Sequence, residues 1–184
     1  MDAPFLQAVA GDLGARGIRV ARFEFPYMAR RREEGRRTAL DRQPVLLATW
    51  RDAIERLGGG PRLVIGGKSL GGRMASMLAD EVKARGLVCL GYPFHPIKQP
   101  ERLRVAHLEQ LRTPTLIVQG TRDPFGRPEE VATYPLSPAI RLLWVEEGDH
   151  DLRPRGGSGG SQAENLGQAC DAIARFLAER ELQE

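Results

Sequence analysis

The stretch from residue 63 to residue 77 constrains the fold of this chain more than any other, because it combines a strand, a sharp turn and a helix. Residues 63–66 predict a short buried strand, and apolar residues at helical spacing follow it. Between them lies the G-x-S-x-G pattern of Gly67, Ser69 and Gly71. We expect both glycines to lie too close to neighbouring backbone to carry a Cβ, because the serine occupies a strained turn. The pattern predicts a serine nucleophile beside a helix whose first free N–H, that of Leu70, is placed to stabilise an oxyanion.

The same turn has two less specific interpretations. A glycine-rich turn between a strand and a helix also serves simply to pack the helix against the sheet, or to cradle a phosphate group. The bare five-residue pattern does not decide between these possibilities. The strand before it and the helix after it favour the catalytic interpretation.

Length and hydropathy bound the class of protein. At 184 residues the chain can bury one substantial core, and we expect a single domain over residues 1–184. No apolar stretch approaches the ~20 residues that a membrane span needs, and the first residues do not resemble a secretion signal. We therefore expect a cytoplasmic protein with no membrane contact.

The charge pattern argues against a nucleic-acid partner. The net charge is +3, but the basic residues are almost all arginine and acidic residues are interspersed with them. The run at residues 29–37, with five arginines and two glutamates, is predicted to be a solvated loop. Cys89 and Cys170 share no motif, so neither a disulfide nor a metal site is expected.

Apolar runs and helical stripes alternate along the rest of the chain. We expect helices at residues 2–15, from Pro44 to the glycines at 58–60, from the serine turn to about residue 85, at 128–133 and at 163–181. We expect strands at residues 18–25, 63–66, 87–91, 115–119 and 140–145. Residues 92–112 are predicted to be irregular, with His95 and His107 as surface or rim histidines. This alternation predicts an α/β protein with a parallel, doubly wound sheet, whose ligands bind at the carboxyl ends of the strands.

Three chemically suited residues follow three of these strands. Ser69, Asp123 and His150 occur in this order along the chain, which is the order of a nucleophile, an acid and a base on an α/β sheet. Taken singly, Asp123 could form a turn before Pro124, and His150 could be an ordinary loop histidine. The three together favour a catalytic triad.

Four motifs carry a resemblance to a known family. They are RFEFPY at residues 22–27, GGKSLGGRMAS at 66–76, QGTRDPFG at 119–126 and EGDHDL at 147–152. The chain resembles the α/β-hydrolase superfamily, and within it the dienelactone-hydrolase-like branch. The resemblance implies Ser69 as nucleophile, His150 as general base, Asp123 as its orienting acid and the Leu70 amide as an oxyanion donor, with no cofactor. Dienelactone hydrolases proper carry a cysteine nucleophile, so their substrate is not implied.

Members of the superfamily also have a strand ahead of the first helix, which ends in a loop that supplies a second oxyanion donor. This chain begins after that loop, so the resemblance implies an α/β-hydrolase fold lacking its N-terminal strands. We expect residues 19–25 to pair directly with residues 63–66 in a five-stranded sheet, because unpaired buried backbone groups are costly. The alternative is that natural upstream residues are missing from the sequence. Loss of one donor costs ~10²–10³ in turnover, so a poor hydrolase is expected.

Two functions from different classes follow. The first is a serine hydrolase that cleaves an ester or related acyl bond of a small molecule, without metal or other cofactor. The second is a catalytically silent scaffold used for protein–protein contacts, since the branch also includes a subunit of a chromatin-modifying complex. Neither the substrate nor the oligomeric state follows from the sequence.

Overall fold

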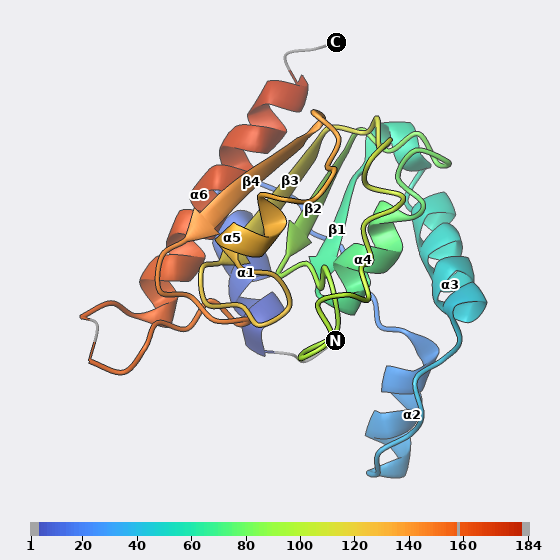
Figure 1. The fold of residues 1–184 in the computed structure, drawn as a ribbon. Coiled ribbons are helices and arrows are strands. Elements are labelled where there is room, and N and C mark those ends of the chain that lie inside the picture. The colour runs from blue at the N-terminus through green and yellow to red at the C-terminus, as the bar shows by residue number, and fades with distance from the viewer. Residues whose placement is uncertain (1–3, 158, 182–184) are drawn as a thin grey trace.

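A four-stranded parallel sheet forms the centre of the molecule (Figure 1). The computed structural model of the chain describes residues 4–157 and 159–181. The strands are β1 (Val64–Lys68), β2 (Gly86–Leu90), β3 (Thr115–Gly120) and β4 (Ile140–Val145), and they neighbour one another in chain order. Every residue of β2 and β3 is buried, as expected for continuous apolar strands covered on both faces.

Helices cover both faces of this sheet. The helical elements of the described residues are α1 (Pro4–Ala15), α2 (Pro26–Glu34), α3 (Gln43–Arg56), the 3₁₀ turn η1 (Gly60–Arg62), α4 (Leu70–Ser76), α5 (Pro128–Val131) and α6 (Gln162–Glu181). Helices α1 and α6 lie on one face, and α3 and α4 lie on the other (Figure 1). Alternate strand residues serve the two faces, so that Cys89 packs towards α4 while Val88 packs towards α6. The predicted doubly wound α/β architecture is therefore confirmed.

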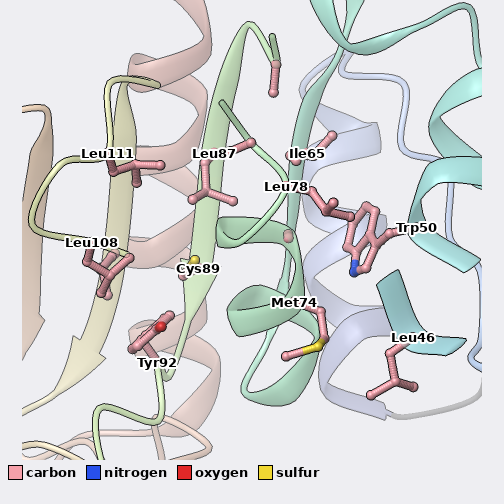
Figure 2. Close-up of a cluster of buried hydrophobic side chains, with 14 of the residues drawn as sticks. Leu46, Trp50, Ile65, Met74, Leu78, Leu87, Cys89, Tyr92, Leu108 and Leu111 are labelled. Atoms are coloured by element: carbon pink, nitrogen blue, oxygen red, sulfur yellow. The ribbon is translucent and has the colours of Figure 1, made fainter. Parts of the chain in front are cut away.

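The core beneath α3 and α4 is a layer of aliphatic, aromatic and sulfur-containing side chains (Figure 2). Met74 and Leu78 lie between the sheet and Trp50 of α3, and each of the two is 1% exposed. Leu108 and Leu111, from the irregular residues 92–112, close the layer at its other end. This packing holds α4 rigidly against β1 and β2.

Residues 18–25 do not form the predicted strand. Strand β1 pairs with β2, and the described residues place no strand on its other edge, so the expected pairing with residues 63–66 in a five-stranded sheet is wrong. The aromatic residues of the segment are buried by a helix instead, since the rings of Phe23 and Trp50 lie 4.7 Å apart. Val20, an apolar residue earlier in the segment, stays 40% exposed. The apolar residues of this segment are therefore explained by contact with α3 and not by pairing in the sheet.

The charged residues 29–37 also differ from the prediction, because most of them lie in α2 and not in a loop. Pro26 occupies the first turn of this helix, and Gly35 ends it in the left-handed conformation (φ 63°). Asp41 accepts hydrogen bonds from the Tyr27 N–H and the Arg30 guanidinium. Helix α2 lies apart from the sheet, at the lower right of Figure 1.

The other described boundaries lie within two residues of the predicted ones, except at the end of α4. Helix α4 ends at Ser76 and not near residue 85, and turns follow it. Asp80 in these turns accepts hydrogen bonds from the backbone N–H groups of Arg112 and Thr113, which ties them to the segment before β3. The expected start of the first helix at Asp2 lies outside the described residues. Within the described residues, no helix combines the length and apolarity that crossing a bilayer requires.

Candidate active site

Ser69 lies on the sharp turn between β1 and α4 that the sequence predicts. Its backbone has φ 51° and ψ −117°, a conformation that costs a non-glycine residue ~1–3 kcal/mol. Two hydrogen bonds hold it there: the Ser69 N–H donates to the Leu90 carbonyl (2.9 Å), and the Arg73 N–H donates to the Ser69 carbonyl (3.0 Å). The first of these bonds continues the β1–β2 ladder by one residue. The strained turn is thus fixed to the end of the neighbouring strand.

The glycines that this turn needs are not both the expected ones. A Cβ on Gly67 would lie 2.8 Å from the Gly71 carbonyl carbon, so that position does exclude a side chain. A Cβ on Gly71 would meet nothing within 4 Å, which contradicts the prediction for that glycine. The crowded position is Gly72, where a Cβ would lie 2.6 Å from the Gly67 carbonyl oxygen and 3.2 Å from Cys89 Sγ. Gly72 is therefore explained by the close packing of α4 on the strands.

Asp123 is fully buried in the loop after β3. Its Oδ1 accepts the Phe125 N–H (3.0 Å), and its Oδ2 accepts a hydrogen bond from Gln119 Nε2 (2.9 Å). The same Oδ2 lies 2.8 Å from His150 Nδ1. An ionised carboxylate can only accept, so Nδ1 carries a proton and Nε2 of a neutral His150 is left as an acceptor.

His150 lies in the loop after β4, against the end of β2. A Cβ on Gly91 would be 3.1 Å from His150 Nδ1, so the imidazole packs directly on this glycine, which has φ 61°. Gly91 follows Leu90, whose carbonyl accepts the Ser69 N–H. The ring of Phe125 covers the imidazole at a centroid distance of 4.5 Å. The turn with the serine and the loop with the histidine therefore meet at the carboxyl end of β2.

An ion pair joins the same two segments. Lys68 Nζ lies 2.7 Å from Asp151 Oδ1, so the residue before Ser69 contacts the residue after His150. Partial burial alone would raise the pKa of Asp151, but the hydrogen bond and the charge of Lys68 lower it below its usual value. Asp149 fixes the loop from inside, because its Oδ1 accepts the N–H groups of Asp151 and Arg153.

The structure brings Asp123 and His150 into direct contact and places Ser69 on the other side of the carboxyl end of β2. The described part of the chain contains no hydrogen bond between Ser69 Oγ and His150, so that contact stays a prediction. The same is true of Leu70 as oxyanion donor, although its N–H begins α4 beside Ser69. His150 keeps 23% of its side chain exposed, and Ser69 is also partly exposed, so both are accessible.

Gln119 is a site residue that the sequence analysis missed. Its side chain is fully buried, with Oε1 accepting the Tyr92 N–H (2.7 Å) while Nε2 donates to Asp123. It thereby connects the carboxylate to the chain that leaves β2. An amide inside an apolar strand, four residues before an aspartate, was the available signal.

The structure contains a second serine–histidine pair, Ser76 and His107. Their Oγ and Nε2 atoms lie 2.8 Å apart, and Ser76 Oγ also donates to the Arg73 carbonyl. Tyr92 Oη donates to the Arg104 carbonyl and lies 3.3 Å from the same Nε2. Because both hydroxyl protons go to carbonyls, the consistent arrangement has Nε2–H of His107 donating to both oxygens. Burial, together with the charge of Arg73, lowers the pKa of His107 to about 4. Such a histidine is a poor base for Ser76, which is itself 2% exposed.

His95, which the sequence predicts to be a surface or rim histidine, is not on the surface. It is 3% exposed, with Nδ1 2.9 Å from the Pro96 carbonyl and Nε2 3.6 Å from Glu130 Oε2. Its backbone N–H donates to Phe125 O, which places it under the loop that carries Asp123. Within residues 4–157 and 159–181, no three or more His, Cys, Asp or Glu side chains cluster as a metal site would require.

Comparison with known proteins gives the family. The model of the alpha/beta hydrolase domain family matches residues 1–178. An alpha-beta serine hydrolase homologue from Coxiella burnetii has a similar fold, with a TM-score of 0.70 and 16% identity over 96% of this chain and 77% of its own. An α/β serine hydrolase without a lid from Xanthomonas campestris gives a TM-score of 0.67 at 16% identity, covering 97% of this chain and 74% of that one. The esterase domain of a Rhodothermus marinus protein gives 0.64 at 16% identity, covering 94% and 78%. At this identity the likeness shows the fold, and the family match shows more: the chain belongs to the alpha/beta hydrolase domain family.

Proposed function

We propose that this protein is a serine hydrolase that cleaves an ester or related acyl bond of a small molecule. The observation that carries the proposal is the hydrogen bond of 2.8 Å between His150 Nδ1 and the buried carboxylate of Asp123. It lies beside the end of β2, where the Leu90 carbonyl holds Ser69 in its strained turn. This arrangement orients an imidazole so that its Nε2 is free to accept a proton. Membership of a hydrolase family supports this proposal by analogy.

In the first step of this mechanism, Ser69 Oγ attacks the substrate carbonyl carbon while His150 Nε2 accepts the hydroxyl proton. The Leu70 N–H donates to the oxyanion that forms. Collapse of the tetrahedral intermediate breaks the bond to the leaving group, which takes the proton from His150. Water then attacks the acyl-enzyme by the same route, releases the acid and restores Ser69. Each step needs only these side chains and water.

A fluorophosphonate probe tests this assignment, because it labels a serine only when a base activates it. We expect labelling of the parent protein and none of Ser69→Ala. Ser76→Ala is the matched control, since it removes the hydroxyl of the other serine–histidine pair, and it should be labelled like the parent.

Three outcomes are decisive. Labelling that survives in Ser69→Ala would refute Ser69 as nucleophile. Labelling lost only in Ser76→Ala would move the assignment to Ser76 and His107. No labelling of a correctly folded parent would favour the alternative of a catalytically silent scaffold for protein contacts.

A further inference from the structure

A cavity of about 630 Å³ opens beside the helix that carries the serine turn. Arg73 of α4 lines one side of it, and the irregular segment after β2 lines the rest with Pro96, Glu101, Arg102, Leu103 and Arg104. Arg73 lies one helical turn after Ser69, as the hydrogen bond between its N–H and the Ser69 carbonyl shows. Helical side chains lean towards the N-terminus of their helix, so the stem of Arg73 leans towards the serine turn.

The wall of this cavity has an excess of positive charge. Three arginines face it and one glutamate, Glu101. In the described part of the chain, no carboxylate lies within ion-pair distance of Arg73, Arg102 or Arg104. Elsewhere the protein does pair its arginines, for example Arg51 with Glu81 and Arg141 with Glu179.

Arg73 is the most exceptional of the three. Its Nε is buried and has no hydrogen-bond partner. A buried guanidinium N–H without an acceptor is costly, and such groups in native proteins normally have a partner. Arg102, in contrast, donates to Gln99 Oε1 at 2.6 Å. Because Nε is shielded from solvent, an anion in the cavity would meet the guanidinium of Arg73 at its terminal N–H groups, and the case for a ligand rests on the unpaired charge of the three arginines.

Neighbouring groups respond to this unpaired charge. Partial burial and then the charge of Arg73 lower the pKa of Arg104. Burial and the same charge lower the pKa of His107 to about 4, so His107 adds no positive charge of its own near neutral pH. An anion in the cavity would relieve the repulsion between Arg73 and Arg104.

We propose that this cavity holds a carboxylate or phosphate group of the substrate, so that the protein acts on anionic acyl compounds. Guanidinium groups suit both oxyanions, because their paired N–H groups match two oxygens at once. The identity of the bound group as part of a substrate rests on the proposed hydrolase function. The binding of an anion to the cavity does not.

The first experiment therefore measures binding without catalysis. Monomethyl succinate and methyl phosphate are titrated separately into Ser69→Ala while the arginine Nε–H resonances are followed by NMR. We expect saturable shifts for at least one of them, with affinity weakened about tenfold when Arg73→Gln or Arg102→Gln is added. Arg112→Gln is the matched control, because the side chain of Arg112 is 87% exposed and lies outside the cavity. The Arg102 variant changes an exposed side chain, so it keeps the test valid if Arg73→Gln misfolds.

The two probes also separate the possible sources of the anion. A response to monomethyl succinate alone identifies a carboxylate, and a response to methyl phosphate alone identifies a phosphate. Equal binding in all variants, or no binding of either probe, would overturn the proposal.

The second experiment compares kcat/KM for p-nitrophenyl hemisuccinate and the neutral p-nitrophenyl butyrate. We expect the ratio of charged to neutral ester to fall about tenfold in Arg73→Gln and in Arg102→Gln, and to be retained in Arg112→Gln. Hydrolysis of both esters with a ratio that no variant changes would overturn the cavity proposal and leave the hydrolase intact. Anion binding without hydrolysis of either ester would overturn the hydrolase and leave the anion site intact.

Discussion

Replacement of Gln119 by leucine is the sharpest perturbation of the candidate site that leaves Ser69, Asp123 and His150, the three proposed triad residues, in place. Leucine has a similar volume and fits an apolar strand, so packing changes little. What changes is hydrogen bonding, because the fully buried amide both accepts the Tyr92 N–H at 2.7 Å and donates to Asp123 Oδ2 at 2.9 Å.

The Tyr92 N–H and the Asp123 carboxylate would each lose a hydrogen bond inside the protein, and the longer contacts of Gln119 Nε2 with the Tyr92 and Gly126 carbonyls would be lost as well. A buried donor without a partner costs ~1–3 kcal/mol, and a carboxylate that keeps its other contacts loses a similar amount. We therefore expect Gln119→Leu to lower the free energy of unfolding by roughly 2–6 kcal/mol. Asp123 would also be held less firmly, which should lower kcat by on the order of tenfold or more, since small misplacements are costly in catalysis.

Urea denaturation measures the first effect, and ester hydrolysis well below the unfolding midpoint measures the second. Gln162→Leu is the matched control: Gln162 is only partly buried and donates one hydrogen bond, to the Asp151 carbonyl at 2.8 Å. It should cost about 1 kcal/mol or less. If Gln119→Leu were as stable as this control, the described role of Gln119 would be refuted.

Two further predictions concern residues in or beside helix α4. Because the folded pKa of His107 lies at about 4 and the unfolded value is ~6.5, the unfolded chain takes up the proton first as pH falls. The stability that neutral His107 contributes is therefore complete above pH ~6.5 and is lost as the pH falls towards 4. Urea denaturation at neutral pH and at pH 4 should show that the free energy of unfolding falls by about 2–3 kcal/mol more in the parent than in His107→Gln. Equal losses in the two proteins would contradict this reasoning. Gly72→Ala places a Cβ 2.6 Å from the Gly67 carbonyl oxygen, so it should lower the free energy of unfolding by ~1–3 kcal/mol. The Cβ of Gly71→Ala meets nothing within 4 Å, so this variant should be neutral or stabilising by up to ~1 kcal/mol. Thermal unfolding of the two alanine variants compares them directly, and equal midpoints would show that the contact at Gly72 is not rigid.

The sequence predicted those features that depend on local pattern. The run at residues 140–145 is apolar and bounded by turns, and it forms β4 with the predicted limits. The serine turn, Asp123 and His150 each follow a strand, and parallel strands bring their carboxyl ends to one edge. That rule does not give the contacts between loops, so the packing of His150 on Gly91 required the structure.

Prediction failed where one pattern has two physical causes. Alternating apolar residues at 18–25 fit a strand, but Trp50 of α3 provides the apolar surface that Phe23 contacts. The charges of residues 29–37 suggested a loop, although salt bridges and a left-handed glycine are equally compatible with α2. The arginine cavity could not be predicted at all, because Arg73 and Arg104 are far apart in sequence and meet only in the folded chain.

The ion pair between Lys68 and Asp151 also bears on how this scaffold could be rebuilt. Because the lysine precedes the serine and the aspartate follows the histidine, the two loops form one exchangeable unit and not two. A histidine loop transplanted from another hydrolase would arrive without a partner for Lys68, whose side chain is only 16% exposed. Engineers who graft residues 146–153 elsewhere should therefore carry position 68 with them, and those who randomise either loop should let both positions vary together.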